Sequence, residues 1–121
     1  MVISSFLNDY NKADYIVGHN VRFDINVLSA ELFRMNNKIN LFEKPQICTM
    51  QLSVELCKIP NIWGSYKFPK LQELYYKLFN KFFEDAHNSM SDVKATFDCF
   101  YELRSRGVIK IKNKTTSDLP F

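Results

Sequence analysis

The fold of this chain is decided by one stretch, Tyr15-Ile16-Val17-Gly18-His19-Asn20-Val21-Arg22-Phe23-Asp24, which joins a strand-like run to a helical pattern. Its first four residues are apolar or small and have strand character. Beyond the stretch, apolar residues recur at helical spacing at Ile25, Leu28, Leu32 and Met35. We therefore predict a strand at Tyr15–Gly18 and a helix from Asp24 to about Asn36, which together form one βα unit.

Asp24 lies at the junction between the predicted strand and the predicted helix. Ligands of open α/β sheets bind beyond the carboxyl ends of the strands, so a carboxylate at this place is well positioned for chemistry. Asp is also a common capping residue at helix N-termini, which is the alternative interpretation.

The rest of the chain predicts a second βα unit and two more helices. A short helix is expected near Ser5–Ala13, a strand at Gln46–Thr49, and a helix at Met50–Lys58 that Pro60 stops. The last two helices have apolar faces at Leu71, Leu74, Tyr75 and Leu78, and at Val93, Phe97, Phe100 and Leu103, and Gly107 closes the second of them. We expect all these faces to bury against one sheet, Val108–Lys112 to add an edge strand, and Asn113–Phe121 to be loose.

A histidine precedes an acid by five residues near the C-terminus, in the stretch Ala86-His87-Asn88-Ser89-Met90-Ser91-Asp92. An amphipathic helix begins here. Five residues on one continuous helix rotate by roughly 140°, which would point the two side chains apart. We therefore expect His87 on the preceding loop or in the first helical turn. The alternative is a surface His beside a helix-capping acid.

Together the two motifs resemble the DEDDh family of 3′–5′ exonucleases, the DnaQ-like group that includes RNase T and polymerase proofreading subunits such as that of DNA polymerase III. The likeness covers nearly all of residues 1–107, and it rests on Gly18-His19-Asn20-x-x-Phe23-Asp24 and on His87-x-x-x-x-Asp92 followed by Ala95-Thr96. The segments Ile47–Met50 and Phe68–Tyr75 also fit.

The resemblance implies an α/β fold of the ribonuclease H-like class and hydrolysis at the 3′ end of a single-stranded DNA or RNA. It implies two Mg²⁺ or Mn²⁺ ions, because hard cations prefer oxygen ligands. Asp24 and Asp92 would be metal ligands, and His87 would be the general base that takes a proton from the attacking water.

The sequence departs from the family at its beginning, since no Asp-x-Glu occurs in it, whereas family members open with a strand that bears this motif. We expect an N-terminally truncated fold whose first strands are missing, with a partial exonuclease domain at 1–107. Two carboxylates alone hold at most one weakly bound cation. The open edge of the Tyr15–Gly18 strand would pair with a complementing N-terminal segment, a polymerase or a second copy of the chain. A non-catalytic module that binds nucleic acid or a partner is the second functional interpretation.

Other candidate contacts with substrate are His19, Asn20 and the segment Trp63-Gly64-Ser65-Tyr66-Lys67. Within that segment Trp63, Tyr66 and Lys67 combine aromatic and basic groups, as single-strand sites do. The alternatives are that Asn20 supports the turn before Asp24 and that the aromatic residues of the segment cover the core.

Composition agrees with one small domain and permits a nucleic-acid ligand. The chain has 121 residues and a formal net charge of +3. Cys48, Cys57 and Cys99 are widely spaced, which indicates reduced thiols rather than a zinc set with His19 and His87. We find no pattern of a membrane span or a secretory leader, so a cytoplasmic location is expected.

Overall fold

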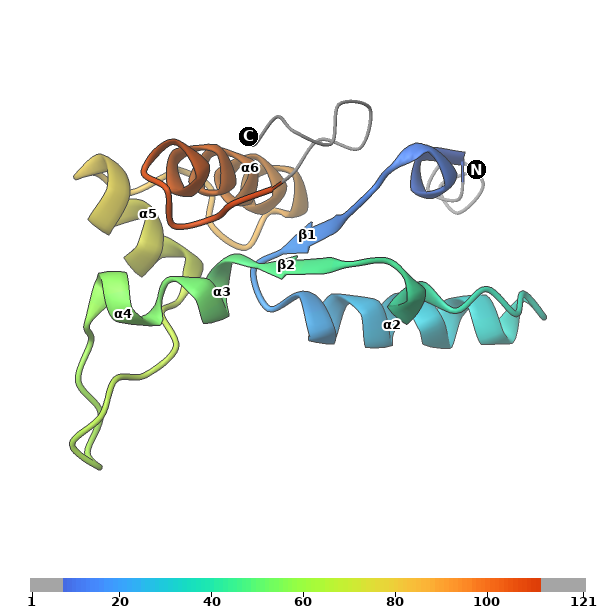
Figure 1. Cartoon of the computed structure of the whole chain (residues 1–121), viewed down its shortest axis with the longest axis horizontal. Helices are drawn as coiled ribbons and strands as arrows, with labels where there is room; N and C mark the ends of the chain where they lie inside the picture. Colours follow the sequence, from blue (N-terminus) through green and yellow to red (C-terminus); the bar gives the residue numbers. More distant parts are fainter. Residues whose placement is uncertain (1–7, 112–121) are drawn as a thin grey trace.

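The computed structural model describes residues 8–111. Residues 8–12 are helical, and they are followed by β1 (Ile16–Gly18), α2 (Val21–Arg34), a 3₁₀ turn at Leu41–Glu43 and β2 (Gln46–Cys48). The chain then forms two short helices, α3 (Thr49–Leu52) and α4 (Val54–Cys57), and two longer ones, α5 (Leu71–Phe79) and α6 (Ser89–Ser105). Figure 1 shows this order. No helix within the described range is long and apolar enough to cross a bilayer.

The two strands form a small parallel sheet, with α2 as the crossover between them. The pairs are Ile16 with Gln46, Val17 with Ile47 and Gly18 with Cys48. Within residues 8–111, β2 is the only strand that pairs with β1. The predicted α/β class and both predicted strands are therefore confirmed to within one residue.

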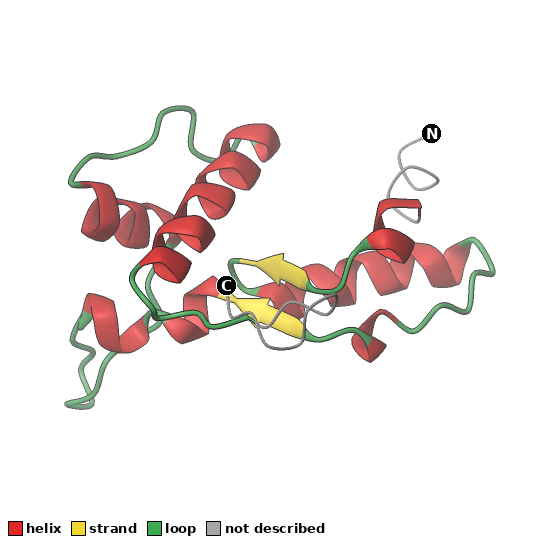
Figure 2. Cartoon of the chain, turned by 45° about the horizontal axis from the view of Figure 1, so that its top comes forward, coloured by secondary structure: helices red, strands yellow, loops and turns green. Residues whose placement is uncertain are grey.

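The sheet separates two apolar clusters, because successive residues of a strand point to opposite faces. Cys48 packs with the α2 cluster, which also contains Tyr10, Val21, Ile25, Leu32 and Leu41. Ile47 packs on the other face, with Leu74, Leu78, Cys99, Leu103, Ile109 and Ile111. Figure 2 shows α2 alongside the strands and the α5–α6 pair beyond them.

Helix α2 begins three residues earlier than predicted. Asn20 adopts a left-handed conformation with φ of 77°, which Asn tolerates better than most residues. Its carbonyl oxygen accepts hydrogen bonds from the backbone N–H groups of Phe23 (3.1 Å) and Asp24 (3.4 Å), so the helical ladder is already under way at Asp24.

The single helix predicted at Met50–Lys58 is wrong, because the chain breaks at Ser53 into α3 and α4. The buried Ser53 hydroxyl donates to the carbonyl oxygen of Thr49 at 2.6 Å. Such back-bonding by serine bends helices. Lys58 then closes α4 in a left-handed conformation with φ of 49°.

The edge strand predicted at Val108–Lys112 is also wrong over its described residues, 108–111, which form no strand. Gly107 has φ of 80°, which confirms its predicted capping role. The N–H groups of Gly107 and Val108 donate to the carbonyls of Arg104 (3.0 Å) and Leu103 (2.9 Å), the Schellman pattern. This turn folds the chain back, so that Ile109 and Ile111 are buried in the core. Lys112 and the tail at 113–121 lie outside the described residues.

The face by which α6 packs agrees with the predicted one only in part: Leu103 is buried and Phe100 packs against the core, as predicted, but Val93 and Phe97 do not. Ala95, Cys99 and Leu103 are buried, whereas Val93 is 62% exposed and Phe97 is 55% exposed. Met90 and Tyr101 are exposed as well, so α6 carries an apolar stripe that the described chain does not cover. The prediction that all helical faces bury against one sheet therefore fails at α6.

Candidate active site

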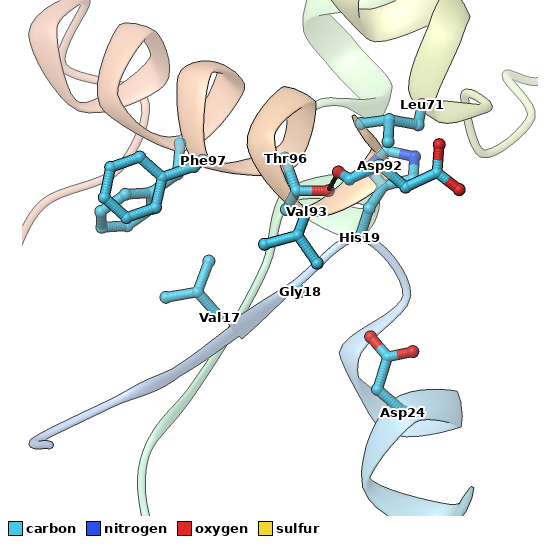
Figure 3. A pocket seen from close by; sticks show the side chains of 10 residues that line it. Val17, Gly18, His19, Asp24, Leu71, Asp92, Val93, Thr96 and Phe97 are labelled. Atoms are coloured by element: carbon cyan, nitrogen blue, oxygen red, sulfur yellow. Dashed lines mark hydrogen bonds between the residues drawn. The ribbon is translucent and has the colours of Figure 1, made fainter. Parts of the chain in front are cut away.

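A cavity of about 440 Å³ lies at the carboxyl end of β1, between the first turn of α2 and helix α6. Its lining is mostly apolar and includes the two acids that the sequence singled out. The residues that line it are Val17, Gly18, His19, Asp24, Leu71, Asp92, Val93, Thr96, Phe97 and Phe100. In Figure 3 the carboxyl end of β1 lies between Asp24 and Asp92. Two carboxylates that are 68 positions apart in the sequence thus face one cavity.

Asp24 is held in place by the tight connection from β1 to α2. Gly18 is essential to this connection, because a Cβ atom at that position would lie 2.6 Å from Oδ2 of Asp24 and 3.2 Å from Cα of Val21. Burial raises the pKa of the Asp24 carboxyl above its usual range. Asp24 as a whole remains exposed, so a cation could reach its carboxylate from solvent and would stabilise its charge.

Asp92 lies in the first turn of α6, beyond the residue that caps this helix. The side chain of Asn88 accepts hydrogen bonds from the N–H groups of Met90 (3.0 Å) and Ser91 (3.3 Å). Oδ1 of Asp92 accepts a hydrogen bond from the backbone N–H of His87 at 3.2 Å. Asp92 is therefore tied to the loop before its own helix.

His87 lies on that loop, as predicted, in a left-handed conformation with φ of 73°. It is exposed and does not line the main cavity. Instead it lines a neighbouring cavity of about 300 Å³, together with Lys70, Leu71 and Asp92. Leu71 and Asp92 belong to both cavities, so the imidazole sits next to the site rather than within it.

His19 lines the main cavity, but both of its ring nitrogens are engaged inside the chain. Nε2 donates to the carbonyl oxygen of Pro69 at 2.8 Å, so Nδ1 is the acceptor for the Thr49 hydroxyl at 2.9 Å in the neutral ring. Burial lowers the pKa of His19, although the hydrogen bond to Pro69 partly opposes this. No ring nitrogen remains to support the predicted contact with substrate.

The profile of the RNase T family, described as exonuclease, matches residues 2–100 of the chain. The chain belongs to this exonuclease family. Neither a curated protein nor a solved structure gives a significant match. RNase T exonucleases are DEDDh, DnaQ-like enzymes with a ribonuclease H-like fold, and they use divalent metal ions.

The two acids of the RNase T motifs are of the right chemical type to bind a hard divalent cation, but two are too few to hold it tightly. Asp24 and Asp92 supply carboxylate oxygens, the donors that Mg²⁺ and Mn²⁺ prefer. No group of three or more His, Cys, Asp or Glu residues within positions 8–111 is arranged to hold a metal ion. The cysteines offer no alternative centre: all three are free, Cys48 and Cys99 are buried, and burial raises the pKa of the Cys99 thiol to about 12.

Three further residues that the sequence suggested as contacts with substrate lie outside the main cavity. Asn20 forms the left-handed turn before α2, and its side chain makes no capping hydrogen bond. Lys67 binds Glu73, with Nζ and Oε1 2.6 Å apart. Trp63 is 82% exposed, so the alternative that the aromatic residues of its segment cover the core is wrong for this residue.

Thr49 and the exposed face of α6 were not predicted from the sequence. Thr49 is fully buried, its hydroxyl donates to Nδ1 of His19, and its Oγ1 lies 3.4 Å from the carbonyl oxygen of Gly18. Its position directly after Ile47 and Cys48, at a strand end, is the signal that could have revealed it. Phe97 and Val93 follow the same helical spacing as core residues, so nothing in the pattern distinguishes them.

Proposed function

We propose that this chain is the larger, C-terminal part of a metal-dependent 3′–5′ exonuclease domain, which hydrolyses phosphodiesters at the 3′ end of single-stranded DNA or RNA. One observation carries the proposal: Asp24 and Asp92 line one cavity from the first turns of two helices, at the carboxyl end of β1. The family membership supports the same reaction class.

In this proposal the two carboxylates hold Mg²⁺ or Mn²⁺. The ion would supply charge that stabilises the reacting phosphate. His87 accepts the proton of the attacking water, since imidazole titrates near neutral pH. Its place on a loop beside Asp92 allows the ring to approach a phosphate held in the cavity. His19 has a positioning role, because it ties the end of β1 to Thr49 and Pro69.

Two carboxylates are too few for the two-ion arrangement, so we propose that a further strand bearing Asp-x-Glu completes the site. The outer edge of β1 supports this idea, since β2 is its only strand partner within residues 8–111. Val17 of β1 is 37% exposed and lines the same cavity as Val93 and Phe97 of α6. A strand added there would gain backbone hydrogen bonds from β1 and cover apolar side chains of α6.

The second candidate function is a non-catalytic relative that binds nucleic acid or a protein partner. The absence of Asp-x-Glu from the 121 residues favours it. The presence of both His87 and Asp92 favours the nuclease, because a binding module has no chemical need for a general base.

The deciding experiment is to supply the missing strand. The chain, fused behind a strand that bears Asp-x-Glu, should release nucleotides from the 3′ end of a labelled single strand when Mg²⁺ or Mn²⁺ is present. The unfused chain should be nearly inactive. Activity of the fusion should disappear in Asp24→Asn, Asp92→Asn and His87→Ala.

Asp98→Asn is the matched control, because Asp98 lies on α6, outside the main cavity, and pairs with Lys94 at the surface. This variant should retain the activity of the fusion. A soluble, folded fusion without metal-dependent hydrolysis would favour the binding module, and full activity of the unfused chain would show that no further acids are needed.

A further inference from the structure

The segment 58–70 joins α4 to α5 and projects away from the rest of the molecule, as the green and yellow loop in Figure 1 shows. Its tip, Ile62 and Trp63, is 87% and 82% exposed. Tyr66 and Phe68 are exposed as well. We name residues 59–67 the finger. Four large apolar side chains are thus exposed on one short ordered projection, and several exposed apolar residues gathered in one place mark an interaction site.

Hydrogen bonds hold the finger in one conformation. Two backbone hydrogen bonds join its two arms. The N–H of Asn61 donates to the carbonyl oxygen of Ser65 (2.9 Å), and the N–H of Lys67 donates to the carbonyl oxygen of Ile59 (2.8 Å). Across the tip, Oδ1 of Asn61 accepts from the N–H groups of Trp63 (2.8 Å) and Ser65 (3.1 Å). The tip is thus presented ready for contact, which reduces the entropy lost on binding.

The charged side chains within the segment itself all have one sign. Residues 58–70 include Lys58, Lys67 and Lys70 and no acidic residue. Glu73 neutralises Lys67, whereas Lys58 and Lys70 are exposed and form no salt bridge with any described residue. Exposed aromatic groups beside exposed lysines match a single-stranded nucleic acid better than an apolar protein surface.

The finger is also connected to the candidate active site. Lys70 lines the cavity that contains His87 and Asp92, and Leu71 lines both cavities. The carbonyl of Pro69 accepts the hydrogen bond from His19 at 2.8 Å. Lys70 therefore lines the same cavity as Asp92, and it follows the finger by three residues in the sequence.

We propose that the finger is a second contact for the substrate strand, in which Trp63 stacks on a base and Lys58 and Lys70 face phosphates upstream of the 3′ end. This inference rests on the proposed function, which it extends from the site of cleavage to the path of the strand. Tyr66 and Lys67 shape the finger in this arrangement, and the contact is made by its tip.

Fluorescence provides a direct test, because Trp63 is the only tryptophan of the chain. Unlabelled oligothymidylate of about 16 nucleotides, the upper end of common single-strand site sizes, is titrated into the chain with a chelator present to prevent cleavage. Stacking should quench the emission with the same midpoint as the anisotropy change of a labelled copy of the strand.

Substitutions test the energetic contribution. Trp63→Ala should weaken binding at least about five-fold, since replacing a stacking aromatic by alanine has this effect or a larger one, and Trp63→Phe should restore most of it. The matched control is Phe33→Ala, because Phe33 lies on α2 and, at 81% exposed, is as accessible as Trp63.

The results separate this inference from the proposed function. The finger contact is overturned if anisotropy detects binding, Trp63 fluorescence is not quenched, and the Trp63→Ala and Phe33→Ala chains bind equally well. The exonuclease proposal then stays intact. Absence of any binding to the intact chain overturns the finger contact, while the activity of the fused chain still decides the exonuclease proposal. Quenching together with a loss confined to Trp63→Ala establishes the contact.

Discussion

Nε2 of His19 donates a hydrogen bond of 2.8 Å to the carbonyl oxygen of Pro69, 50 positions along the chain. The other ring nitrogen contacts the hydroxyl of Thr49 at 2.9 Å. One imidazole thus joins the end of β1, the start of α3 and the segment before α5. Gly18 and His19 at the end of β1 and Leu71 at the start of α5 line the cavity that also contains Asp24 and Asp92, so His19 fixes two walls of the candidate site relative to each other.

This arrangement predicts a pH dependence of stability. Burial lowers the pKa of His19 below that of the unfolded chain, although the hydrogen bond to Pro69 partly opposes the shift. Between these two pKa values the unfolded state binds more protons, so the free energy of unfolding must fall as pH falls below about 6.5. The slope from this one group is at most about 1.4 kcal/mol per pH unit.

Urea unfolding at a series of pH values measures this slope. In His19→Gln the decline in this window should be smaller than in the wild type, although the variant is less stable at neutral pH. His87→Gln, which removes the other histidine, is the control and should keep the wild-type slope. A His19→Gln chain with an unchanged slope would contradict the link to this ring.

Gly18→Ala should disturb the site through contact rather than through backbone conformation. The added methyl would lie 2.6 Å from Oδ2 of Asp24, so the carboxylate or the start of α2 must move. We expect a loss of about 1–3 kcal/mol in the free energy of unfolding, as for other overpacked positions, and weaker binding of Mn²⁺ in calorimetry.

Gly64→Ala is the matched control for Gly18→Ala. Nothing lies within 4 Å of the added methyl, but the φ of +83° strains any residue with a side chain. It should therefore destabilise the finger while leaving Mn²⁺ binding intact. Equal effects of the two variants on Mn²⁺ binding would contradict the contact between Gly18 and Asp24.

Metal binding separates the role proposed for the acids from that of the histidine. Asp24→Asn and Asp92→Asn should each weaken Mn²⁺ binding by more than about ten-fold, because even the loss of a group that only hydrogen-bonds to a metal ligand has an effect of this size. His87→Ala should leave the affinity nearly unchanged, because His87 does not line the main cavity. Calorimetry on the fused chain measures all three, and an equal loss in all three would argue against His87 as the base.

Local signals predicted the elements that position the acids, and they failed where tertiary packing decides. The strand at Ile16–Gly18 and the cap at Gly107 follow from apolar runs and from glycine chemistry. The break at Ser53 depends on a buried hydroxyl that bonds back to Thr49. Helical periodicity could not tell the buried Leu103 from the exposed Phe97, because both recur at the same spacing and only the neighbouring segments decide which is covered.

The position of His19 shows the same limit within the site. The motif Gly18-His19-Asn20 identified the right turn, and it could not reveal that both ring nitrogens are used inside the chain. The resemblance to the DEDDh family predicted that Asp24 and Asp92 lie together, since it makes both acids metal ligands. Strand ends predicted only the place of Asp24, because α2 follows β1 whereas α6 follows α5. The number of acids in the site was readable from the sequence itself, and it remains the strongest constraint on the activity.

The uncovered stripe on α6 predicts self-association of the unfused chain. Val93 and Phe97 line a cavity with Val17 of β1, which has an edge that no strand within residues 8–111 pairs with. Both features favour contact with another chain. In sedimentation the isolated chain should be a dimer or a larger species, and the fusion that carries the added strand should be a monomer. Phe97→Lys should shift the isolated chain toward monomer, since a charge replaces an aromatic group in the proposed contact.

Phe33→Lys provides the comparison, because it places the same charge on an equally accessible aromatic position of α2. It should leave the association of the isolated chain unchanged if the contact is made at β1 and α6. A monodisperse monomer of the unmodified chain, with a cooperative unfolding transition, would show that the edge of β1 and the stripe need no partner. The case for a strand that completes the site would then rest on the count of carboxylates alone.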